Sequence, residues 1–416
     1  MSEAQKQVWK GAIPLQIHLH ESEVTTLPPP PPALVLAPRI GYLPLLISLL
    51  KPQFSTTLPP GVDTIWFEYK GLPLKWYIPT GVLFDLLCVE PERPWNLTVH
   101  FRGYPSIVLL PCEGEDSVKW SFINSLKEVS YVISSVYAHV YDGLPYLGTT
   151  DIIYYCIYDK ISNDMTGIQK KAPVSALSCR AVGVLAKLGG VGLQAAYVIN
   201  GNSKNVMNMS QTDQVELWGS VLNGNFETYR RVASKLKLGT FEDEYMENVS
   251  SVLVKSSQST GDTDVTGQLK TGRIPVRLYL WTVNEEFDDF EDAPQIDNWD
   301  KVSYINRPVE IYKEDGKYFS LNDAVKRILP EFFLENSFVT DGDANINQSG
   351  EEGESSSDPG SCCNTLEIAE IKLVRIQGIE PILDIPFSWV VNNLMNPEYF
   401  LHMCVCLKVS KANAVQ

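Results

Sequence analysis

Basic residues are scarce in this chain. Its 416 residues carry 34 lysines and arginines against 50 aspartates and glutamates, which gives a formal net charge of -16. Nonspecific nucleic-acid binding rests on neutralising phosphates with Lys and Arg, and an anionic membrane repels an acidic chain. The composition therefore argues against nucleic acid as a partner, and we expect any membrane association to be indirect.

Uninterrupted apolar runs are also missing. The most apolar stretch, "ALVLAPRIGYLPLLISLL", is broken by Pro38, Arg39 and Pro44, so it does not predict a membrane span. The first residues, "MSEAQKQVWK", lack the apolar core of a secretory signal. The eight cysteines are scattered and predict no disulfide framework. A reducing, cytoplasmic location is therefore expected.

Signatures of catalysis are absent as well. There is no P-loop, no Rossmann glycine fingerprint and no nucleophile elbow. His18 and His20 share one face of a predicted strand but have no third metal ligand nearby. His402, Cys404 and Cys406 also share a face, and here we favour packing over zinc. We expect no metal, no cofactor and no catalytic residue, and we keep an enzyme based on the two cysteines only as a third hypothesis.

The chain does contain a sequence pattern that occurs twice. Residues 11–19 read "GAIPLQIHL" and residues 272–280 read "GRIPVRLYL". Each is followed by a second strand, a helix, a hairpin, a short helix and a last strand. In the first copy the helix is expected within residues 41–54, "GYLPLLISLLKPQF", with its end at Pro52. Five pairs of residues share a constant separation of 307 positions: Gly71 and Gly378, Ile78 and Ile385, Pro79 and Pro386, Asp85 and Asn392, Leu87 and Leu394. This order of elements is that of the β-grasp, the ubiquitin fold, which predicts a duplication.

The segment between the two copies has helical spacing. Phe122, Leu126, Val129 and Ile133 fall on one stripe, and Lys127 lies about 140° from Phe122, so we expect Lys127 to point outward. The predicted fold class is therefore α+β, with two ubiquitin-like β-grasp domains flanking a helix-rich domain. The predicted bounds are 8–112 for the first ubiquitin-like domain, 115–239 for the helix-rich domain, 240–271 for a linker and 272–408 for the second ubiquitin-like domain.

Two internal segments depart from this plan. Residues 133–198 interrupt the helical pattern, and "YVI" occurs on both sides, at 131–133 and at 197–199. We interpret them as a retained intron or gene-model error, with a genuine lineage-specific loop as the alternative; transcript reads would distinguish the two. Residues 335–367 have the acidic, Ser-rich composition of a disordered insert.

Several stretches resemble the autophagy protein 5 family, in a plant-like version. The most specific are "IWFEYKGLPLKWYIPTGVLFDLL" and "VRIQGIEPILDIPFSWVVNNL", and "FINSLKEVSYV" adds to them. The resemblance implies a non-enzymatic scaffold. Its lysine within "NSLKEVS", Lys127, would accept the C-terminal glycine of autophagy protein 12 through an E1-like and an E2-like enzyme. The conjugate would bind the N-terminal helix of autophagy protein 16 and act like an E3 in the lipidation of autophagy protein 8. The implied location is the cytoplasm and, peripherally, the preautophagosomal structure and phagophore membrane.

Two points stay open at this level. The chain could instead be a tandem ubiquitin-like adaptor that is never conjugated. The helix of autophagy protein 16 would enter an apolar groove where the two β-grasp domains meet the helical domain. Its residues are not assigned, and the aromatic candidates are Trp66, Trp76, Trp299 and Trp389.

Overall fold

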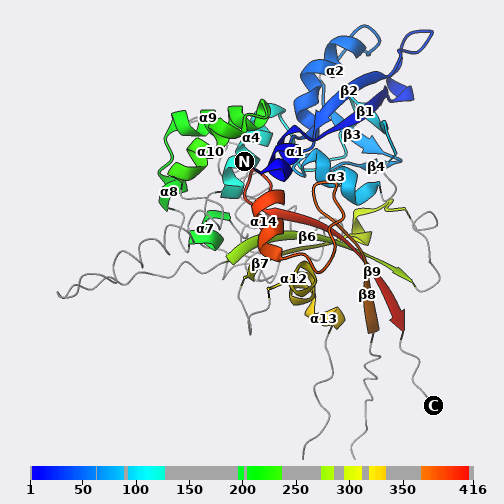
Figure 1. The fold of residues 1–416 in the computed structure, drawn as a ribbon. Helices are drawn as coiled ribbons and strands as arrows, with labels where there is room; N and C mark the ends of the chain where they lie inside the picture. The colour runs from blue at the N-terminus through cyan, green and yellow to red at the C-terminus, as the bar shows by residue number, and fades with distance from the viewer. Residues whose placement is uncertain are drawn as a thin grey trace, which may run out of the picture.

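The computed structural model describes residues 2–61, 63–88, 92–126, 195–200, 204–236, 273–284, 295–311, 318–333 and 367–411. Figure 1 shows three parts: a sheet with its helices from the N-terminal region, a group of helices, and a second sheet from the C-terminal region. The predicted α+β class is confirmed.

The first sheet has the strand order β2-β1-β5-β3-β4. β1 runs antiparallel to β2 and parallel to β5, and β3 runs antiparallel to β5 and β4. Its strands are β1 (Ala12–Leu19), β2 (Ala33–Pro38), β3 (Trp66–Tyr69), β4 (Leu72–Pro73) and β5 (Trp95–His100). Burial alternates along β1, because one face packs on the core and the other does not.

The helix under this sheet differs from its prediction in one respect. A 3₁₀ turn at Leu43–Leu46 leads into α2 (Ile47–Phe54), and Pro52 lies inside α2 instead of ending it. The expected stop at Pro52 is therefore wrong. The proline removes a single N–H donor near the end of a short helix, whereas Phe54 is fully buried in the core of the domain. The free energy gained by burying the Phe54 ring outweighs the tendency of Pro52 to end the helix.

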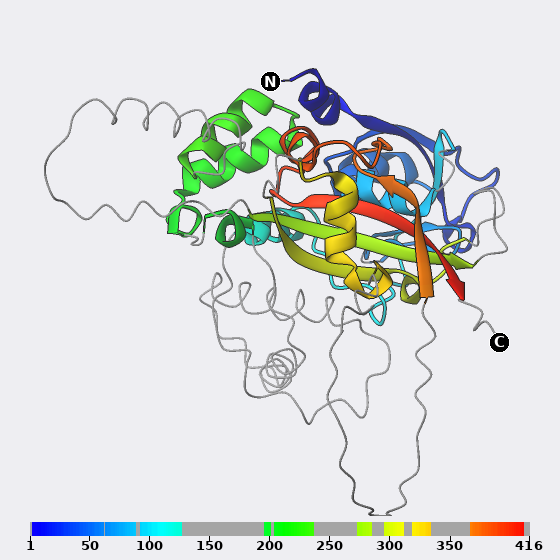
Figure 2. The same ribbon diagram turned by 60° about the horizontal axis from the view of Figure 1, so that its bottom comes forward.

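The second sheet repeats the first. Its order is β7-β6-β9-β8, in which β6 runs antiparallel to β7 and parallel to β9, and β8 runs antiparallel to β9. Its strands are β6 (Arg273–Asn284), β7 (Ser303–Glu310), β8 (Glu367–Arg375) and β9 (Leu401–Lys411). The helices of this half are α12 (Leu321–Ile328), α13 (Pro330–Phe333) and α14 (Phe387–Leu394). Figure 2 shows α12 lying across one face of the sheet, as the single helix of a β-grasp does.

The duplication extends to backbone angles. The short helix α3 (Thr80–Leu87) and α14 begin and end at positions 307 residues apart. In the hairpins that precede them, Lys70 and Gly71 have φ of 48° and 86°, and Gln377 and Gly378 have φ of 53° and 75°. Two consecutive positive φ values are the requirement of a type I′ turn. The glycine pair seen in the sequence therefore marks the same turn in both copies.

The two central strands of the second sheet, β6 and β9, are buried on both faces. On one face, Val276, Leu278 and Leu280 of β6 belong to the core that also holds α12. On the other, Tyr279 and Trp281 belong to the core of the first domain. This explains why burial is nearly continuous along β6 but alternates along β1. The first ubiquitin-like domain thus covers the outer face of the second.

The helical part lies beside both sheets (Figure 1). Its helices are α4 (Glu115–Leu126), α7 (Ala195–Asn200), α8 (Lys204–Met207), α9 (Gln211–Leu222) and α10 (Phe226–Lys235). Among the described residues, no helix has the length and apolar character needed to cross a membrane.

An N-terminal helix, α1 (Glu3–Lys10), joins the three parts. Its Trp9 ring lies 5.3 Å from the ring of Phe226 and 4.7 Å from that of Tyr229, both on α10. The Tyr229 hydroxyl donates to the Pro397 carbonyl, 2.7 Å away, and α1 also contacts α14. The Trp9 contacts tie α1 to the helical part, and the Tyr229 hydrogen bond ties the helical part to the second ubiquitin-like domain.

Candidate functional site

The predicted acceptor follows directly on α4. The stripe expected on this helix is confirmed as far as the structure describes it, since Phe122 and Leu126 are buried. Phe122 packs on Trp218 of α9, with ring centroids 5.6 Å apart, and the indole N–H of Trp218 donates to Glu115 at 2.9 Å. α4 is therefore packed firmly into the helical part up to Leu126. Lys127, Val129 and Ile133 lie outside the described residues, so the outward orientation of Lys127 stays a prediction.

The predicted inserts also lie largely outside the described residues. That holds for residues 240–271, for residues 335–366 and for most of 133–198. The last four positions of 133–198 are an exception. They begin α7, where Ala195 and Ala196 are buried in the core shared with α4 and α9, and Val198 is buried as well. The C-terminal end of this segment therefore contributes side chains to the helical core.

A buried ionic cluster joins the two ubiquitin-like domains. The Asp85 carboxylate on α3 accepts hydrogen bonds from Arg39 of its own domain and from the backbone N–H of Gly378 in the second domain, the latter at 2.7 Å. Arg375 of β8 donates back to the carbonyls of Asp85 and Cys88 at 3.2 and 2.8 Å. Burial raises the pKa of the Asp85 carboxyl, and Arg39 acts in the opposite direction. Sequence reasoning noted Asp85 only as a member of the repeat.

Gly378 is required by this cluster. A Cβ added there would lie 2.8 to 3.0 Å from the guanidinium atoms of Arg39, at a φ of 75° that disfavours any side chain. We expect Gly378→Ala to lower the free energy of unfolding by about 1–3 kcal/mol. The matched control is Gly71→Ala, which has the same turn and φ but open space around the new methyl group. Urea denaturation of both variants measures the difference, and equal losses would contradict a role for the contact with Arg39.

Three of the four candidate tryptophans are structural. Trp76 is buried, and Trp66 and Trp299 are half-buried. Each donates its indole N–H to a backbone carbonyl: Trp66 to that of Arg102 at 2.9 Å, Trp76 to that of Leu110 at 2.9 Å and Trp299 to that of Pro73 at 2.8 Å. Trp389 on α14 differs, because 41% of it is exposed. Ile379 and Ile382, on the loop that leads into α14, are 40% and 74% exposed. We call Ile379, Ile382 and Trp389 the α14 patch.

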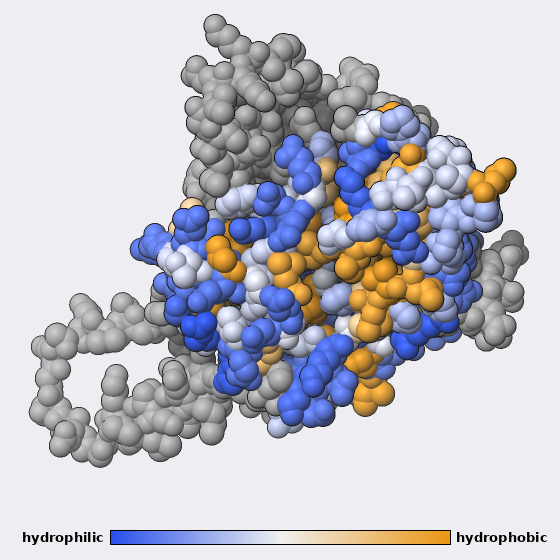
Figure 3. Space-filling model, turned by 90° about the horizontal axis from the view of Figure 1, so that it is seen from above, coloured by the Kyte–Doolittle hydropathy of each residue, from blue (hydrophilic) through white to orange (hydrophobic). Residues whose placement is uncertain are grey.

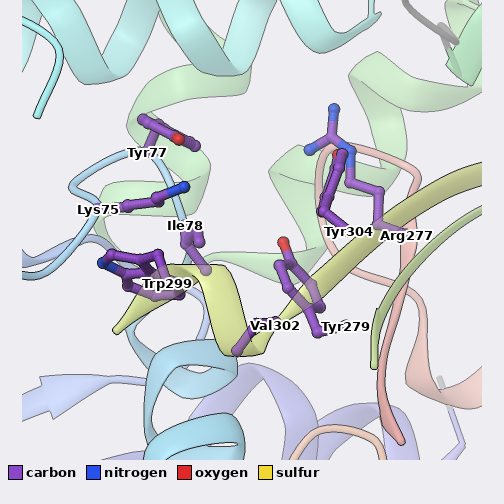
Figure 4. A pocket seen from close by; sticks show the side chains of 8 residues that line it. All are labelled: Lys75, Tyr77, Ile78, Arg277, Tyr279, Trp299, Val302 and Tyr304. Carbon is purple, nitrogen blue, oxygen red and sulfur yellow. The ribbon is translucent and has the colours of Figure 1, made fainter. Parts of the chain in front are cut away.

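A pocket of about 40 Å³ opens between the two ubiquitin-like domains. Figure 4 shows Lys75 and Tyr77 of the first domain facing Arg277 and Tyr304 of the second across it. Trp299 forms one wall, and the Lys75 ammonium lies 4.9 Å from the centre of its ring. The lining is aromatic and cationic.

The histidine and cysteine residues considered for metal binding have other partners. Burial lowers the pKa of His402, and a neutral ring there donates to Glu398 at 2.8 Å and accepts from the Tyr279 hydroxyl at 3.2 Å. Burial also raises the pKa of the Cys404 and Cys406 thiols, that of Cys406 to about 12. A raised pKa is the reverse of what a nucleophilic thiol needs.

The other two histidines considered for metal binding, His18 and His20, also contact other side chains. His18 pairs with Gln16 at 3.0 Å, and the ring of His20 stacks on that of His100 with centroids 4.3 Å apart. Sequence spacing gave no sign of His100, which the fold brings in from β5. Within the described part of the chain, no three His, Cys, Asp or Glu side chains are grouped to hold a metal ion.

Known proteins match every part of this arrangement. The family models "Autophagy protein ATG5, UblA domain", "alpha-helical bundle region" and "UblB domain" match residues 8–101, 194–239 and 273–405. Autophagy protein 5 of Arabidopsis thaliana is 53% identical over 98% of each chain. That of Oryza sativa subsp. indica is 46% identical over 99% of this chain and 95% of its own. The crystal structure of Kluyveromyces marxianus Atg5 covers 97% of this chain and 99% of its own, with a TM-score of 0.50 at 17% identity, and supports the fold alone.

The tandem ubiquitin-like domains and these relatives support a role in autophagy. The matches run from the first sheet, through the helical part, to the second sheet. The chain belongs to the autophagy protein 5 family.

Proposed function

We propose that this chain is a non-enzymatic scaffold that accepts autophagy protein 12 at Lys127. An E1-like and an E2-like enzyme would deliver the C-terminal glycine of autophagy protein 12 as a thioester. The conjugate would bind autophagy protein 16 and act like an E3 in the lipidation of autophagy protein 8. Its place of action would be the cytoplasmic side of the preautophagosomal structure and phagophore membrane, reached through partners.

The conjugation step sets a clear chemical demand on the acceptor. The neutral Lys127 amine attacks the thioester carbonyl, the E2 thiol leaves, and an isopeptide bond replaces the thioester. A solvated lysine ammonium has a pKa of about 10.4, so the E2 must assist the loss of its proton. The acceptor chain needs only to hold the lysine within reach of the E2 thioester.

One structural observation supports this proposal most. α4 is held through Phe122 and Leu126 in the core of the helical part, and the lysine of the family motif is the next residue along the chain. A well-packed helix that leads up to the acceptor would give the E2 a fixed surface to dock against. The thiols of Cys404 and Cys406 are buried, which weighs against the enzyme hypothesis.

Reconstitution with purified components tests the proposal. The chain is incubated with autophagy protein 12, its E1-like and E2-like enzymes and ATP, and the product is followed by gel shift and mass spectrometry. A variant lacking residues 133–194, which keeps all of α7, is run beside it. A shift mapped to Lys127 in either chain supports acceptor function, and a shift only in the shortened chain shows that the segment blocks the site. No shift in either would favour the unconjugated adaptor.

The α14 patch is the surface we assign to the helix of autophagy protein 16. Trp389 is the exposed one of the four candidate tryptophans, and α14 lies where the second ubiquitin-like domain contacts α1. Aromatic residues at the centre of a helix-binding groove carry much of the binding energy.

We expect Trp389→Ala to weaken binding of an N-terminal peptide of autophagy protein 16 by about 2 kcal/mol or more, close to thirtyfold. Isothermal titration calorimetry measures this. The control is Leu49→Ala, another exposed apolar residue, which lies on α2 of the first domain. An unchanged affinity in Trp389→Ala, or an equal loss in Leu49→Ala, would remove the α14 patch from the binding surface.

A further inference from the structure

A run of five prolines, Pro28–Pro32, leads directly into the edge strand β2. Proline fixes φ near -65° and keeps the preceding residue extended, so such a run adopts a polyproline II helix with three residues per turn. Exposure varies along the run: Pro28, Pro29 and Pro31 are exposed, Pro30 and Pro32 are half-buried, and Ala33, three residues after Pro30, is buried. One ridge of the helix thus faces the protein and another faces solvent.

Hydrogen bonds hold the chain just before this run and at one position within it. Before it, the buried Glu23 carboxylate accepts the backbone N–H groups of Phe101 and Arg102 at 2.8 and 3.1 Å. Thr25 donates from both its backbone N–H and its hydroxyl to the Thr57 carbonyl, at 3.0 and 2.6 Å. Within the run, Gln53 of α2 donates to the Pro31 carbonyl at 3.3 Å. A segment ordered in this way loses little conformational entropy when a partner binds.

The surroundings of the run are apolar and uncharged. Residues 24–38 contain no charged side chain. Leu27, just before the run, is 95% exposed, and Leu34 and Leu36 on the outer face of β2 are 75% and 67% exposed. Viewed from above, apolar side chains gather over the first ubiquitin-like domain, and Figure 3 shows them beside a polar surround. The surface thus joins proline rings to leucine side chains.

We infer that Leu27–Leu36 is a docking segment for a protein domain with an aromatic-lined polyproline groove. Proline has no N–H, so the run cannot pair with an added strand, but its ring faces and free carbonyls fit a groove of Trp and Tyr side chains. The lack of Lys and Arg disfavours grooves whose specificity depends on an acidic pocket. This interaction is independent of Lys127 and of conjugation.

The test titrates full-length chain into purified, isotope-labelled polyproline readers: profilin and single EVH1, WW and SH3 domains. The readout is the NMR signal of the reader's groove tryptophan. We expect at least one reader to bind and a decaproline peptide to displace it. Replacing the exposed ridge, Pro28→Ala with Pro31→Ala, should weaken binding about tenfold or more. Pro30→Ala, on the inner ridge, is the matched control and should change affinity less than threefold.

Thermal denaturation confirms that each variant is folded. Binding by no reader, or equal binding by the parent and the exposed-ridge variant, would overturn the inference. Self-association of the chain that Leu36→Lys abolishes, without binding of any reader, would assign the surface to a second copy instead and would also overturn it.

Discussion

Replacing Asp85 with alanine is expected to lower the free energy of unfolding by about 3–5 kcal/mol. The carboxylate is almost fully buried, and its partner Arg39 is buried beside it. Removing Asp85 leaves the Arg39 guanidinium in a buried site without its ion-pair partner, and it removes the acceptor of the Gly378 N–H from the other domain. Leaving one member of a buried pair uncompensated costs far more than the pair itself contributes.

Urea denaturation, followed by circular dichroism, measures this loss. The control is Asp63→Ala, which breaks ion pairs with Lys51 and Arg102 at a more exposed site. That variant should lose about 1 kcal/mol or less. Because Asp85 links two domains, its variant should also separate their unfolding into two transitions. A single transition with a loss no larger than that of Asp63→Ala would show that the cluster does not hold the domains together.

The duplication could be predicted because both copies obey local rules. The alternation of β1, the glycine at each hairpin turn and the proline before each short helix are properties of neighbouring residues. They identify the β-grasp order before any contact between distant residues is known. The same holds for the stripe on α4, of which Phe122 and Leu126 are now seen in the core.

Contacts between the domains could not be predicted in this way. Arg39, Asp85 and Gly378 lie far apart in the sequence, and a charged residue on a short helix is usually solvated. One sign was available. "RIPVRLYLWTV" has apolar residues at nearly every position, which is typical of a strand covered on both faces. This apolar pattern predicts that another part of the protein packs on the outer face of the second sheet, and the structure shows that this part is the first domain.

The candidate site shows the same division. Lys127 was assigned from a family motif, and the structure describes only the helix that precedes it, α4. Trp389 could not be separated from Trp66, Trp76 and Trp299 by sequence, because a tryptophan in any of these sequence contexts can be either buried or exposed. Their exposure depends on which elements cover them, and that is a property of the assembled fold.

Replacing Lys127 with arginine is expected to reduce conjugation of autophagy protein 12 to background. Arginine keeps the positive charge and most of the side-chain length, but its guanidinium stays protonated and cannot attack a thioester. The variant therefore removes the nucleophile while keeping the helix and its surface charge. A loss of stability is not expected, because neither shape nor charge of the site changes much.

The most direct measurement compares the parent, Lys127→Arg and Lys119→Arg in the reconstituted conjugation reaction, with the rate of product formation read from gels. Lys119 lies on α4 eight residues earlier and controls for a general loss of lysine on this helix. We predict equal rates for the parent and Lys119→Arg and no product from Lys127→Arg. Conjugation of Lys127→Arg at the parent rate, with the bond mapped to another lysine, would contradict the assignment of Lys127 as the acceptor.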